Sequence, residues 1–402
     1  MKIRWPSATI GSLCDVVNGG TPKTGVAKYW GGKHLWITPA EMGNRPSPYV
    51  NDTERKITDL GLQDSSAKLL PPGSVILSSR APIGHLVINS APMATNQGCK
   101  GLVPNSQLNA KFLYYYLSSI VDLLNSLGTG ATFKELSGTK LKDVPIPLPS
   151  LPEQRRIVGI LDQAFIGIAT AKANAEKNFH SARVLFASYM ESIFNQRAKN
   201  WVRKPLGELC DIKHGFAFKS EFFTANGDYV LLTPGNFYES GGYRDRGEKQ
   251  KYYKGAIPHG YVLTKGDMLV AMTEQAAGLL GSPILVPESD KFLHNQRLGL
   301  VTKKPGVPWD NEFFFHVFNT KAVRDAIHDS SSGVKVRHTS PSKIGEVVVS
   351  FPTSVAEQRE IVAALVRLRD ETQRLADTCQ QKIQALNELR ESLLHQAFTG
   401  AL

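Results

Sequence analysis

The same short motif opens two long helical segments of this chain. "LPEQRRIV" occupies residues 151–158 and "VAEQREIV" occupies residues 355–362, so the two Glu-Gln-Arg triplets begin 204 residues apart, at Glu153 and Glu357. A repeat of this length is about the size of a domain, far beyond the ~20–50 residue units of solenoid proteins. The 402-residue chain is too long for one compact core and is therefore expected to contain two copies of one folding unit.

The repeat continues into the segments that precede each helix. Asn96-Gln97 returns as Asn295-Gln296, 199 residues later, and both dipeptides follow a glycine turn and an apolar run typical of a strand. The offset between matching positions drifts along the chain, as insertions in surface loops would cause. The longest matching segments are "IGSLCDVVNGGTPKT" (10–24) with "LGELCDIKHGFAFKS" (206–220), and "PPGSVILSS" (71–79) with "TKGDMLVAM" (264–272).

The pattern predicts four segments in the order globular, helical, globular, helical. Each globular segment mixes short apolar strands, Gly and Pro turns and one or two short helices, which indicates an α+β fold. Proline-rich joints at 145–152 and 347–354 separate globular from helical segments, because the residue before a proline disfavours helix. We expect globular domains at 1–150 and 201–352, and spacer helices at 151–200 and 353–402.

Apolar residues recur at alternating spacings of three and four along both helical segments, which is typical of helices that pack along a seam. Because a globular segment separates them, the two helices can form an antiparallel coiled coil within one chain. About 40 residues at ~1.5 Å each would make a rod near 60 Å long. The predicted seam is Ile157, Leu161, Ala164, Ile168, Ala171, Ala175, Asn178, Ala182, Leu185 and Tyr189 in the first helix, and Ile361, Leu365, Leu368, Thr372, Leu375, Cys379, Leu386, Leu389 and Leu393 in the second.

The charge balance favours a polyanionic partner without proving one. Lys and Arg total 47 against 36 Asp and Glu. The excess lies in residues 1–150 (15 basic, 9 acidic), 151–200 (7 basic, 4 acidic) and 201–352 (19 basic, 16 acidic), while residues 353–402 carry 6 basic and 7 acidic side chains. Neutralising phosphates releases counterions and so attracts a basic protein to nucleic acid. A soluble protein with a high isoelectric point explains the same numbers equally well.

Several classes of protein are disfavoured by composition. No stretch approaches the ~18 apolar residues of a membrane span, and the N-terminus lacks the apolar run of a secretory signal. The four cysteines form no Cys-x-x-Cys pair, so neither a zinc ribbon nor a disulfide framework is indicated. We therefore expect a cytoplasmic protein with no membrane association and no bound metal.

Catalytic signatures are also missing. Gly20 and Gly25 have the spacing of a phosphate loop, but Val26-Ala27 follows where Lys-Ser/Thr is required. No dinucleotide-binding glycine motif, His-Glu-x-x-His or Gly-x-Ser-x-Gly elbow is present, and "NRPSPY" (44–49) departs by an insertion from the loop with which adenine methyltransferases hold a flipped base. The sequence predicts no catalytic residue and no cofactor in this chain, although a loose nuclease motif would escape such a search.

The candidate DNA contacts lie in Gly-rich or basic loops and carry groups that can reach phosphates or base edges. Any one of them can equally be a solvated turn residue. Asn96-Gln97 and Asn295-Gln296 suit buried amides that fix a loop, and the aromatic runs 114–116 and 313–315 suit a core. The candidates are Thr21, Lys23, Thr24, Lys28, Lys33, Arg80, His85, Thr132 and Lys134 in the first half, and Lys213, His214, Lys219, Tyr238, Arg244, Arg246, Lys249, Lys251, Lys335, Arg337 and His338 in the second.

The whole arrangement resembles the specificity subunit of type I restriction-modification enzymes. The matching segments are "PIPLPSLPEQRRIV", "EQREIV" and the closing "LRESLLHQAFTGAL". The resemblance implies two target recognition domains on an antiparallel spacer, double-stranded DNA as ligand, and modification subunits as partners, with restriction subunits as a further possibility. It also implies that S-adenosylmethionine, ATP and Mg²⁺ belong to those partner chains, and that the present chain is not catalytic by itself.

A mechanism follows in which two readers recognise two different half-sites. A stiff spacer would fix their gap at roughly 35–60 Å, about 10–18 base pairs at ~3.4 Å per step. The segment "QAFTGAL" (396–402) is a candidate contact for partner subunits. Two other classes stay open: a coiled-coil scaffold whose globular domains bind protein or RNA, and a self-contained DNA-modifying enzyme.

Overall fold

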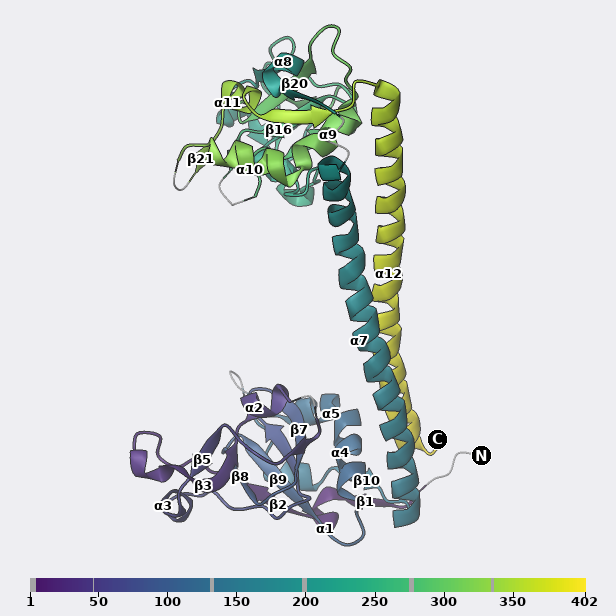
Figure 1. The fold of residues 1–402 in the computed structure, drawn as a ribbon. Coiled ribbons are helices and arrows are strands. Elements are labelled where there is room, and N and C mark those ends of the chain that lie inside the picture. Colours follow the sequence, from purple (N-terminus) through teal and green to yellow (C-terminus); the bar gives the residue numbers. More distant parts are fainter. Residues whose placement is uncertain (1–4, 46, 131–133, 197–200, 275–277, 334–335) are drawn as a thin grey trace. The chain divides into compact units, whose positions relative to one another are not determined.

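The computed structural model of the 402-residue chain describes residues 5–45, 47–130, 134–196, 201–274, 278–333 and 336–402. The chain divides into two compact units, each described here by itself. Unit 1 comprises Met1–Glu176 together with Gln380–Leu402, and unit 2 comprises Lys177–Cys379. Each unit thus combines one strand-rich globular part with a portion of both long helices (Figure 1).

Unit 1 is built on a five-stranded sheet of order β2-β9-β6-β7-β4, a three-stranded sheet of order β5-β3-β8 and the pair β1-β10. The central strand β6 is buried along its whole length because it lies between β9 and β7, so it is apolar or hydroxyl-bearing at every position. The strands are β1 (Ser7–Thr9), β2 (Cys14–Asn18), β3 (Trp30–Ile37), β4 (Tyr49–Val50), β5 (Arg55–Ile57), β6 (Val75–Ser79), β7 (Ile83–Asn89), β8 (Met93–Thr95), β9 (Cys99–Pro104) and β10 (Pro145–Pro147).

Unit 2 repeats the opening of this plan. Its sheets have the orders β12-β20-β16-β18 and β13-β15-β14-β19, with the pairs β11-β22 and β17-β21. The antiparallel pair β12-β20 corresponds to β2-β9 of unit 1, and β11-β22 corresponds to β1-β10. The strands are β11 (Val202–Pro205), β12 (Cys210–His214), β13 (Phe223–Thr224), β14 (Tyr229–Leu231), β15 (Tyr252–Tyr253), β16 (Met268–Ala271), β17 (Thr273–Glu274), β18 (Pro283–Leu285), β19 (Phe292–Leu293), β20 (Leu298–Lys303), β21 (Arg337–His338) and β22 (Val348–Phe351).

Short helices close each core and begin at matching caps. Asn109 accepts hydrogen bonds from the first backbone amides of α4 (Ala110–Ser119), and Asp310 does the same for α9 (Asn311–Asn319). The other short helices are α1 (Ile10–Leu13), α2 (Pro39–Gly43), α3 (Asp59–Gln63), α5 (Val121–Leu127), α6 (Gly138–Lys142), α8 (Leu206–Leu209), α10 (Lys321–Asp329) and α11 (Pro341–Gly345), with the 3₁₀ turns η1 (Ala27–Tyr29), η3 (Ser220–Phe222), η4 (Pro234–Asn236) and η5 (Gly247–Lys249).

The aromatic runs lie in the cores, as the sequence predicted. Tyr115 and Tyr116 of α4 are buried in unit 1, and Phe313 and Phe314 of α9 are buried in unit 2. A base-stacking platform has to be exposed, so these rings are excluded from that role.

The two long helices, α7 (Leu151–Gln196) and α12 (Val355–Thr399), run antiparallel. In unit 1 the early part of α7 meets the late part of α12, where Lys172 Nζ donates to Asn387 Oδ1 at 3.1 Å. In unit 2 the late part of α7 meets the early part of α12, and Ile193 shares a core with Ile361 and Leu365. The predicted α+β architecture with two long antiparallel helices is confirmed.

The seam in unit 2 differs from the predicted one. Leu185 is 50% exposed, and the side chain that packs against the core is Phe186. On α12, Leu375 is 46% exposed while Ala376 is buried. The seam prediction is wrong at Leu185, Leu375 and Tyr189, which is 42% exposed, whereas the predicted Ala182, Thr372 and Cys379 are buried. Ile157, Leu161, Ile168, Ile361 and Leu365 are buried, whereas Leu368, Leu386 and Leu393 are partly buried.

The glutamine of each Glu-Gln-Arg triplet locks a helix onto its globular part. Gln154 is fully buried: its Oε1 accepts from the Asn109 backbone N–H at 2.8 Å, and its Nε2 donates to two carbonyl oxygens, those of Gln107 and Pro149. Gln358 makes the same three kinds of bond, to the Asp310 N–H and to the carbonyls of Pro308 and Pro352. The glutamine of the repeated motif therefore attaches each long helix to its globular part at the proline-rich joint.

The C-terminal segment packs on the core of unit 1. Ala397 is fully buried, and the Phe398 ring lies edge-on against Phe112 and Tyr116, with 5.2 Å between ring centroids in each pair. The expectation that this segment is a partner contact is wrong for Ala397, whose side chain is covered by the chain itself, whereas Phe398 is only partly buried.

Candidate nucleic-acid interface

In unit 1 the glycine turn after β2 packs on the Asn-Gln turn that precedes β9. Asn96 Nδ2 donates to Thr21 Oγ1 at 3.1 Å, and the Gln97 backbone N–H donates to the same oxygen at 3.4 Å. A Cβ on Gly19 would lie 1.9 Å from the Asn96 carbonyl oxygen, so only glycine fits at this position. Asn96 holds the turn together, as expected for a structural amide, while the Gln97 side chain is exposed.

A short hairpin lies beside this turn and carries charged side chains. Thr129 and Glu135 form a bridge, Arg80 and Glu135 form another, and the Leu136 N–H donates to the Ser79 carbonyl at 2.9 Å. The Glu135 carboxylate lies 3.8 Å from Arg80 NH1 and 3.9 Å from Lys100 Nζ. We call Arg80, Lys100 and Glu135 the charged cluster of unit 1.

Unit 2 builds the same frame with different side chains. A Cβ on Gly215 would lie 2.1 Å from the Asn295 carbonyl oxygen, which matches the close approach of Gly19 to Asn96. The Thr339 N–H donates to the Met272 carbonyl at 3.0 Å, and Thr273 pairs with His338 between β17 and β21. Thr273 and His338 thus occupy the places that Arg80 and Glu135 hold in unit 1.

The other candidates of unit 1 are spread over its surface. Lys23, Thr24, Lys28 and Lys33 are exposed, and Lys33 forms an ion pair of 3.0 Å with Asp59 beside the three-stranded sheet. His85 differs, because its Nδ1 lies 3.0 Å from the Pro39 carbonyl oxygen and its ring packs beneath α2. The structure brings Thr21 and Arg80 to one edge, with Lys134 exposed next to Glu135, and leaves Lys33 and His85 elsewhere. Thr132 lies outside the described residues.

In unit 2 three basic candidates share one hollow. Arg244, Arg246 and Lys249 line a concavity of about 530 Å³ together with Gly235, Asp245 and Glu248. Beside it, Tyr238 is 50% exposed and the Arg244 guanidinium lies 5.9 Å from its ring centroid.

The remaining candidates of unit 2 lie on other loops. Lys213 Nζ lies 4.4 Å from the Tyr261 ring centroid, and Lys251 Nζ lies 5.7 Å from the Phe223 ring centroid. His214 and Lys219 are exposed, Lys219 within 3.7 Å of Glu221. Arg337 NH1 lies 3.4 Å from Ser331 Oγ, so it is steadied next to His338. Lys335 lies outside the described residues.

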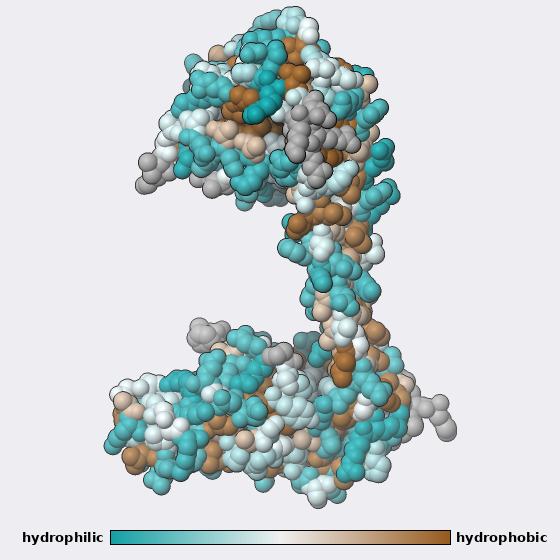
Figure 2. All heavy atoms as spheres, in the orientation of Figure 1, coloured by the Kyte–Doolittle hydropathy of each residue, from teal (hydrophilic) through white to brown (hydrophobic). Residues whose placement is uncertain are grey.

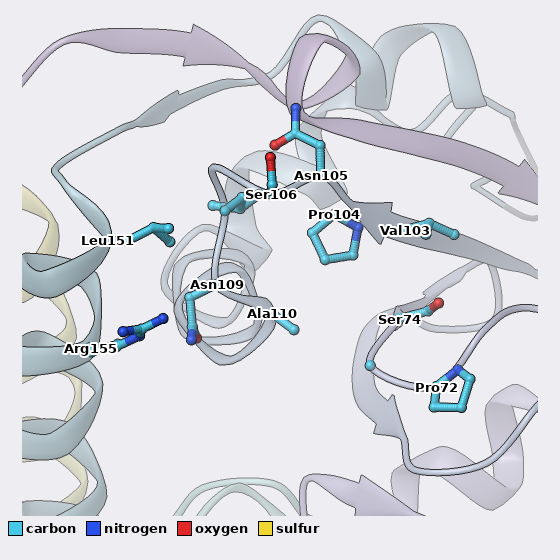
Figure 3. Close-up of a pocket in the computed structure, with 12 residues that line it drawn as sticks. Pro72, Ser74, Val103, Pro104, Asn105, Ser106, Asn109, Ala110, Leu151 and Arg155 are labelled. Carbon is cyan, nitrogen blue, oxygen red and sulfur yellow. The ribbon is translucent and has the colours of Figure 1, made fainter.

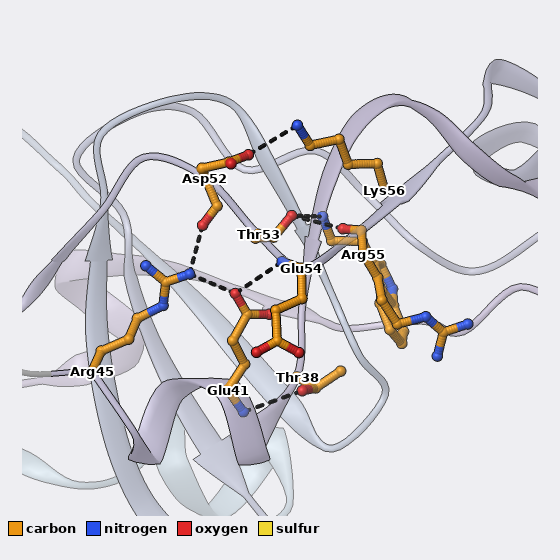
Figure 4. A network of polar contacts seen from close by, with 9 residues as sticks. Thr38, Glu41, Arg45, Asp52, Thr53, Glu54, Arg55 and Lys56 are labelled. Atoms are coloured by element: carbon orange, nitrogen blue, oxygen red, sulfur yellow. Dashed lines mark hydrogen bonds and ion pairs between the residues drawn. The ribbon is translucent and has the colours of Figure 1, made fainter.

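Sequence reasoning missed two arginines near β5, which Figure 4 shows. Arg45 donates to the buried carboxylate of Glu41 and, at 2.7 Å, to the Asp52 carbonyl, so it is committed to the fold. Arg55 is exposed, and its guanidinium lies 3.8 Å from the Trp30 ring centroid. The basic pair Arg55-Lys56 was the available sequence signal. Lys56 pairs with Asp52 at 2.9 Å, and its hydrogen bond holds the pKa of the Asp52 carboxyl below its usual value.

Unit 1 has a hollow that lies away from the predicted loops. It encloses about 360 Å³ between the turn before α4 and the start of α7, and Arg155 is the one charged residue in its lining. Figure 3 shows Arg155 on α7 with Asn105, Ser106 and Asn109 on the facing turn. In the space-filling view, hydrophilic side chains cover much of the visible face of each unit (Figure 2).

The described residues can be assessed for metal-binding clusters and reactive cysteines. No group of three or more His, Cys, Asp or Glu side chains among the described residues could hold a metal ion. The four cysteines are buried and unpaired, and burial raises the pKa of the Cys14, Cys99 and Cys210 thiols to about 12, far from that of a nucleophile. Across the described ranges, no helix is both long and apolar enough to span a bilayer.

Comparison with known proteins agrees with the repeated architecture. The model of the type I restriction modification DNA specificity domain matches residues 2–177 and 198–385. The chain is 32% identical over 227 residues to the MjaIX specificity subunit of a type I restriction enzyme from Methanocaldococcus jannaschii, and this match covers 52% of each protein. The chain therefore spans about half the length of that curated relative.

Solved structures share the fold at low sequence identity. A chain of a type I R-M system, from work on its complex assembly, superimposes with a TM-score of 0.74 at 17% identity over 99% of this chain and 98% of the other. The crystal structure of the HsdS subunit from Thermoanaerobacter tengcongensis gives 0.66 at 16% identity, over 99% and 97%. Because the family model matches both halves of the repeat and covers most of the chain, this protein belongs to the type I restriction-modification DNA specificity family.

Proposed function

We propose that the chain is the specificity subunit of a type I restriction-modification complex and that each unit reads one half-site of a bipartite, asymmetric DNA target. The main support for this proposal is that both units share the same backbone frame but carry different side chains on it. The Gly-Asn contact and the bridged hairpin recur in both units, while Arg80 and Glu135 in one are replaced by Thr273 and His338 in the other. Two readers of one design would then select different bases.

The predicted contacts fall into two groups by chemistry. Basic side chains on flexible stems, such as Lys23, Lys28 and Lys249, suit phosphates and would position the duplex. Side chains carried by the bridged backbone, such as Arg80, Arg337 and His338, suit base edges in the grooves. Gln97 and Gln296 were expected to be buried amides but are exposed, and we add them to the second group because an amide can donate to and accept from a base at once.

The chemistry of modification and cleavage belongs to partner chains in this proposal. Modification subunits would bring S-adenosylmethionine, and restriction subunits would bring ATP and Mg²⁺.

A footprint of the chain assembled with modification subunits tests the proposal. We expect protection of two short half-sites on duplex DNA, and exchange of residues 1–150 for those of a relative should change one half-site only. A change in both half-sites would contradict modular reading. A scaffold that binds protein or RNA would give no sequence-selective footprint, and a self-contained enzyme would methylate or cut DNA without partners.

A further inference from the structure

The charged cluster of unit 1 contains an acidic residue in the place where the proposed interface meets a polyanion. We propose that Glu135 selects a cytosine in the half-site of unit 1 by accepting a hydrogen bond from the cytosine N4 amino group in the major groove. This inference rests on the proposed function and names one base and the atom that reads it.

Two neighbouring cations offset the repulsion between the Glu135 carboxylate and DNA phosphates. A lone carboxylate facing phosphates is repelled, but the Glu135 carboxylate lies 3.8 Å from Arg80 NH1 and 3.9 Å from Lys100 Nζ. The Lys100 side chain is only 8% exposed and lies beneath, whereas the Glu135 side chain is 44% exposed. The cluster therefore carries a net positive charge and still presents a free carboxylate face to solvent.

The backbone of Glu135 is fixed on both sides, as a base reader requires. Its N–H donates to the Thr129 carbonyl at 2.9 Å, and its carbonyl accepts from the Thr129 N–H at 3.0 Å. The next residue is tied to β6, because the Leu136 N–H donates to the Ser79 carbonyl. The backbone at Glu135 therefore has a fixed position on the frame, so ordering the carboxylate on a base costs only the freedom of its own side chain.

The chemistry of a carboxylate singles out cytosine. An ionised carboxylate only accepts hydrogen bonds, and cytosine presents only the N4 donor at its major-groove edge. Adenine places the N7 acceptor beside its N6 donor, and guanine and thymine present acceptors, so each of these bases sets an acceptor against the carboxylate. A glutamine at this position would instead match adenine, because its amide can donate to N7 and accept from N6.

Unit 2 has the same frame without the acid. His338 stands where Glu135 does, Thr273 replaces Arg80, and Gly299 occupies the β20 position that matches Lys100 in β9. All three residues of the cluster differ between the units, while the turn and the hairpin are the same. Residues that select a base are expected to change together in this way, whereas an ion pair that only stabilises the fold has no reason to.

The test uses the full-length chain assembled with modification subunits and a library of duplexes randomised in the unit 1 half-site. The wild type should require cytosine at one position, and Glu135→Gln should move the preference there to adenine, with about a tenfold fall in binding to the cytosine duplex. Selection at the unit 2 half-site should not change, which also shows that the variant is folded. Asp143→Asn, which removes another exposed carboxylate of unit 1, is the matched control and should leave both half-sites unchanged.

A double variant separates base reading from charge balance. If Glu135 served only to neutralise Lys100, Lys100→Met combined with Glu135→Gln would restore the wild-type preference, and that result would overturn the inference. Uniformly tighter binding of Glu135→Gln to all duplexes would also overturn it, since that indicates simple repulsion of phosphates. If the wild-type assembly selects no sequence at all, the proposed function fails, and this outcome differs from selective binding that ignores Glu135.

Discussion

At the scale of single residues, the repeated Glu-Gln-Arg motif has a structural role. Gln154 and Gln358 are completely buried, and each satisfies one N–H and two carbonyl groups at a proline-rich joint. Buried amides of this kind hold a junction because leaving their partners unpaired is costly. The sequence showed that the motif recurs but could not show its hydrogen-bond partners. Asn109 is 45 residues from Gln154, and Asp310 is 48 residues from Gln358.

Replacing Gln154 by leucine should loosen the joint of unit 1. The change leaves the Asn109 N–H and two carbonyls without partners, so we expect the free energy of unfolding to fall by about 2–4 kcal/mol. Urea denaturation measures this, and Gln163→Leu on an exposed face of α7 is the matched control. Equal stability of the two variants would contradict the structural role.

Two buried histidines should make unit 2 sensitive to acid. Burial lowers the pKa of His294 and His316 to about 4, and the charge of Arg369 adds to the effect at His316. Because the unfolded side chains protonate near ~6.5, proton uptake favours unfolding as the pH falls from about 6.5 toward 4, and the stabilisation is complete above that window.

The free energy of unfolding, measured across this pH range, should therefore fall less steeply for His316→Leu than for the wild type. His259→Gln, on an exposed loop of unit 2, should follow the wild-type curve. A His316→Leu curve parallel to that of the wild type would show that this imidazole is not buried in its neutral form.

At the scale of secondary structure, periodicity predicted the two long helices but not every position that faces inward. In the second half of α7 the predicted seam is right at Ala175 and Ala182, which are buried, and wrong at Asn178, Leu185 and Tyr189, which are exposed. The structure turns Phe179, Phe186 and Met190 inward instead. The Phe186 ring lies against α9, where its centroid is 6.4 Å from that of the His316 ring, and a spacing rule carries no information about which neighbour fits such a space.

Adjacent residues on α7 offer a direct test of the stripe. Phe186→Ala should lower the free energy of unfolding by about 2 kcal/mol, because it removes a ring packed on the core of unit 2. Leu185→Ala should change it by less than about 0.5 kcal/mol, because that side chain is half exposed. Chemical denaturation of both variants gives the comparison, and the reverse ranking would restore the predicted seam.

At the scale of the whole molecule, the internal repeat predicted the architecture and the family. It did not predict that each compact unit includes part of both helices, nor which loop residues meet. Arg80 and Lys134 were predicted as separate contacts, and the bridges that gather them around Glu135 depend on strand register over 55 residues of chain. Short sequence patterns do not fix such pairings, whereas the match between residues 10–24 and 206–220 is evident from the sequence alone.

The continuity of the long helices supports a test of the proposed spacing. Both α7 and α12 are unbroken over their whole lengths. Adding one heptad to each would lengthen the pair by about 10 Å at ~1.5 Å per residue, close to three base pairs. Footprints should then show a preferred gap about three base pairs longer between unchanged half-sites. An unchanged gap would rule out the helices as the ruler.

Unit 1 is assembled from two separate parts of the chain, so it can finish folding only after the whole chain is synthesised. Its core includes Leu394 and Ala397, and Arg156 donates to the Leu402 carbonyl 246 residues away, whereas unit 2 is one continuous stretch of chain. Unit 1 is synthesised first, but its core is completed only by residues of α12 that are made after unit 2. Until the end of α12 is made, the apolar faces of α4 and α7 that it covers stay exposed to solvent.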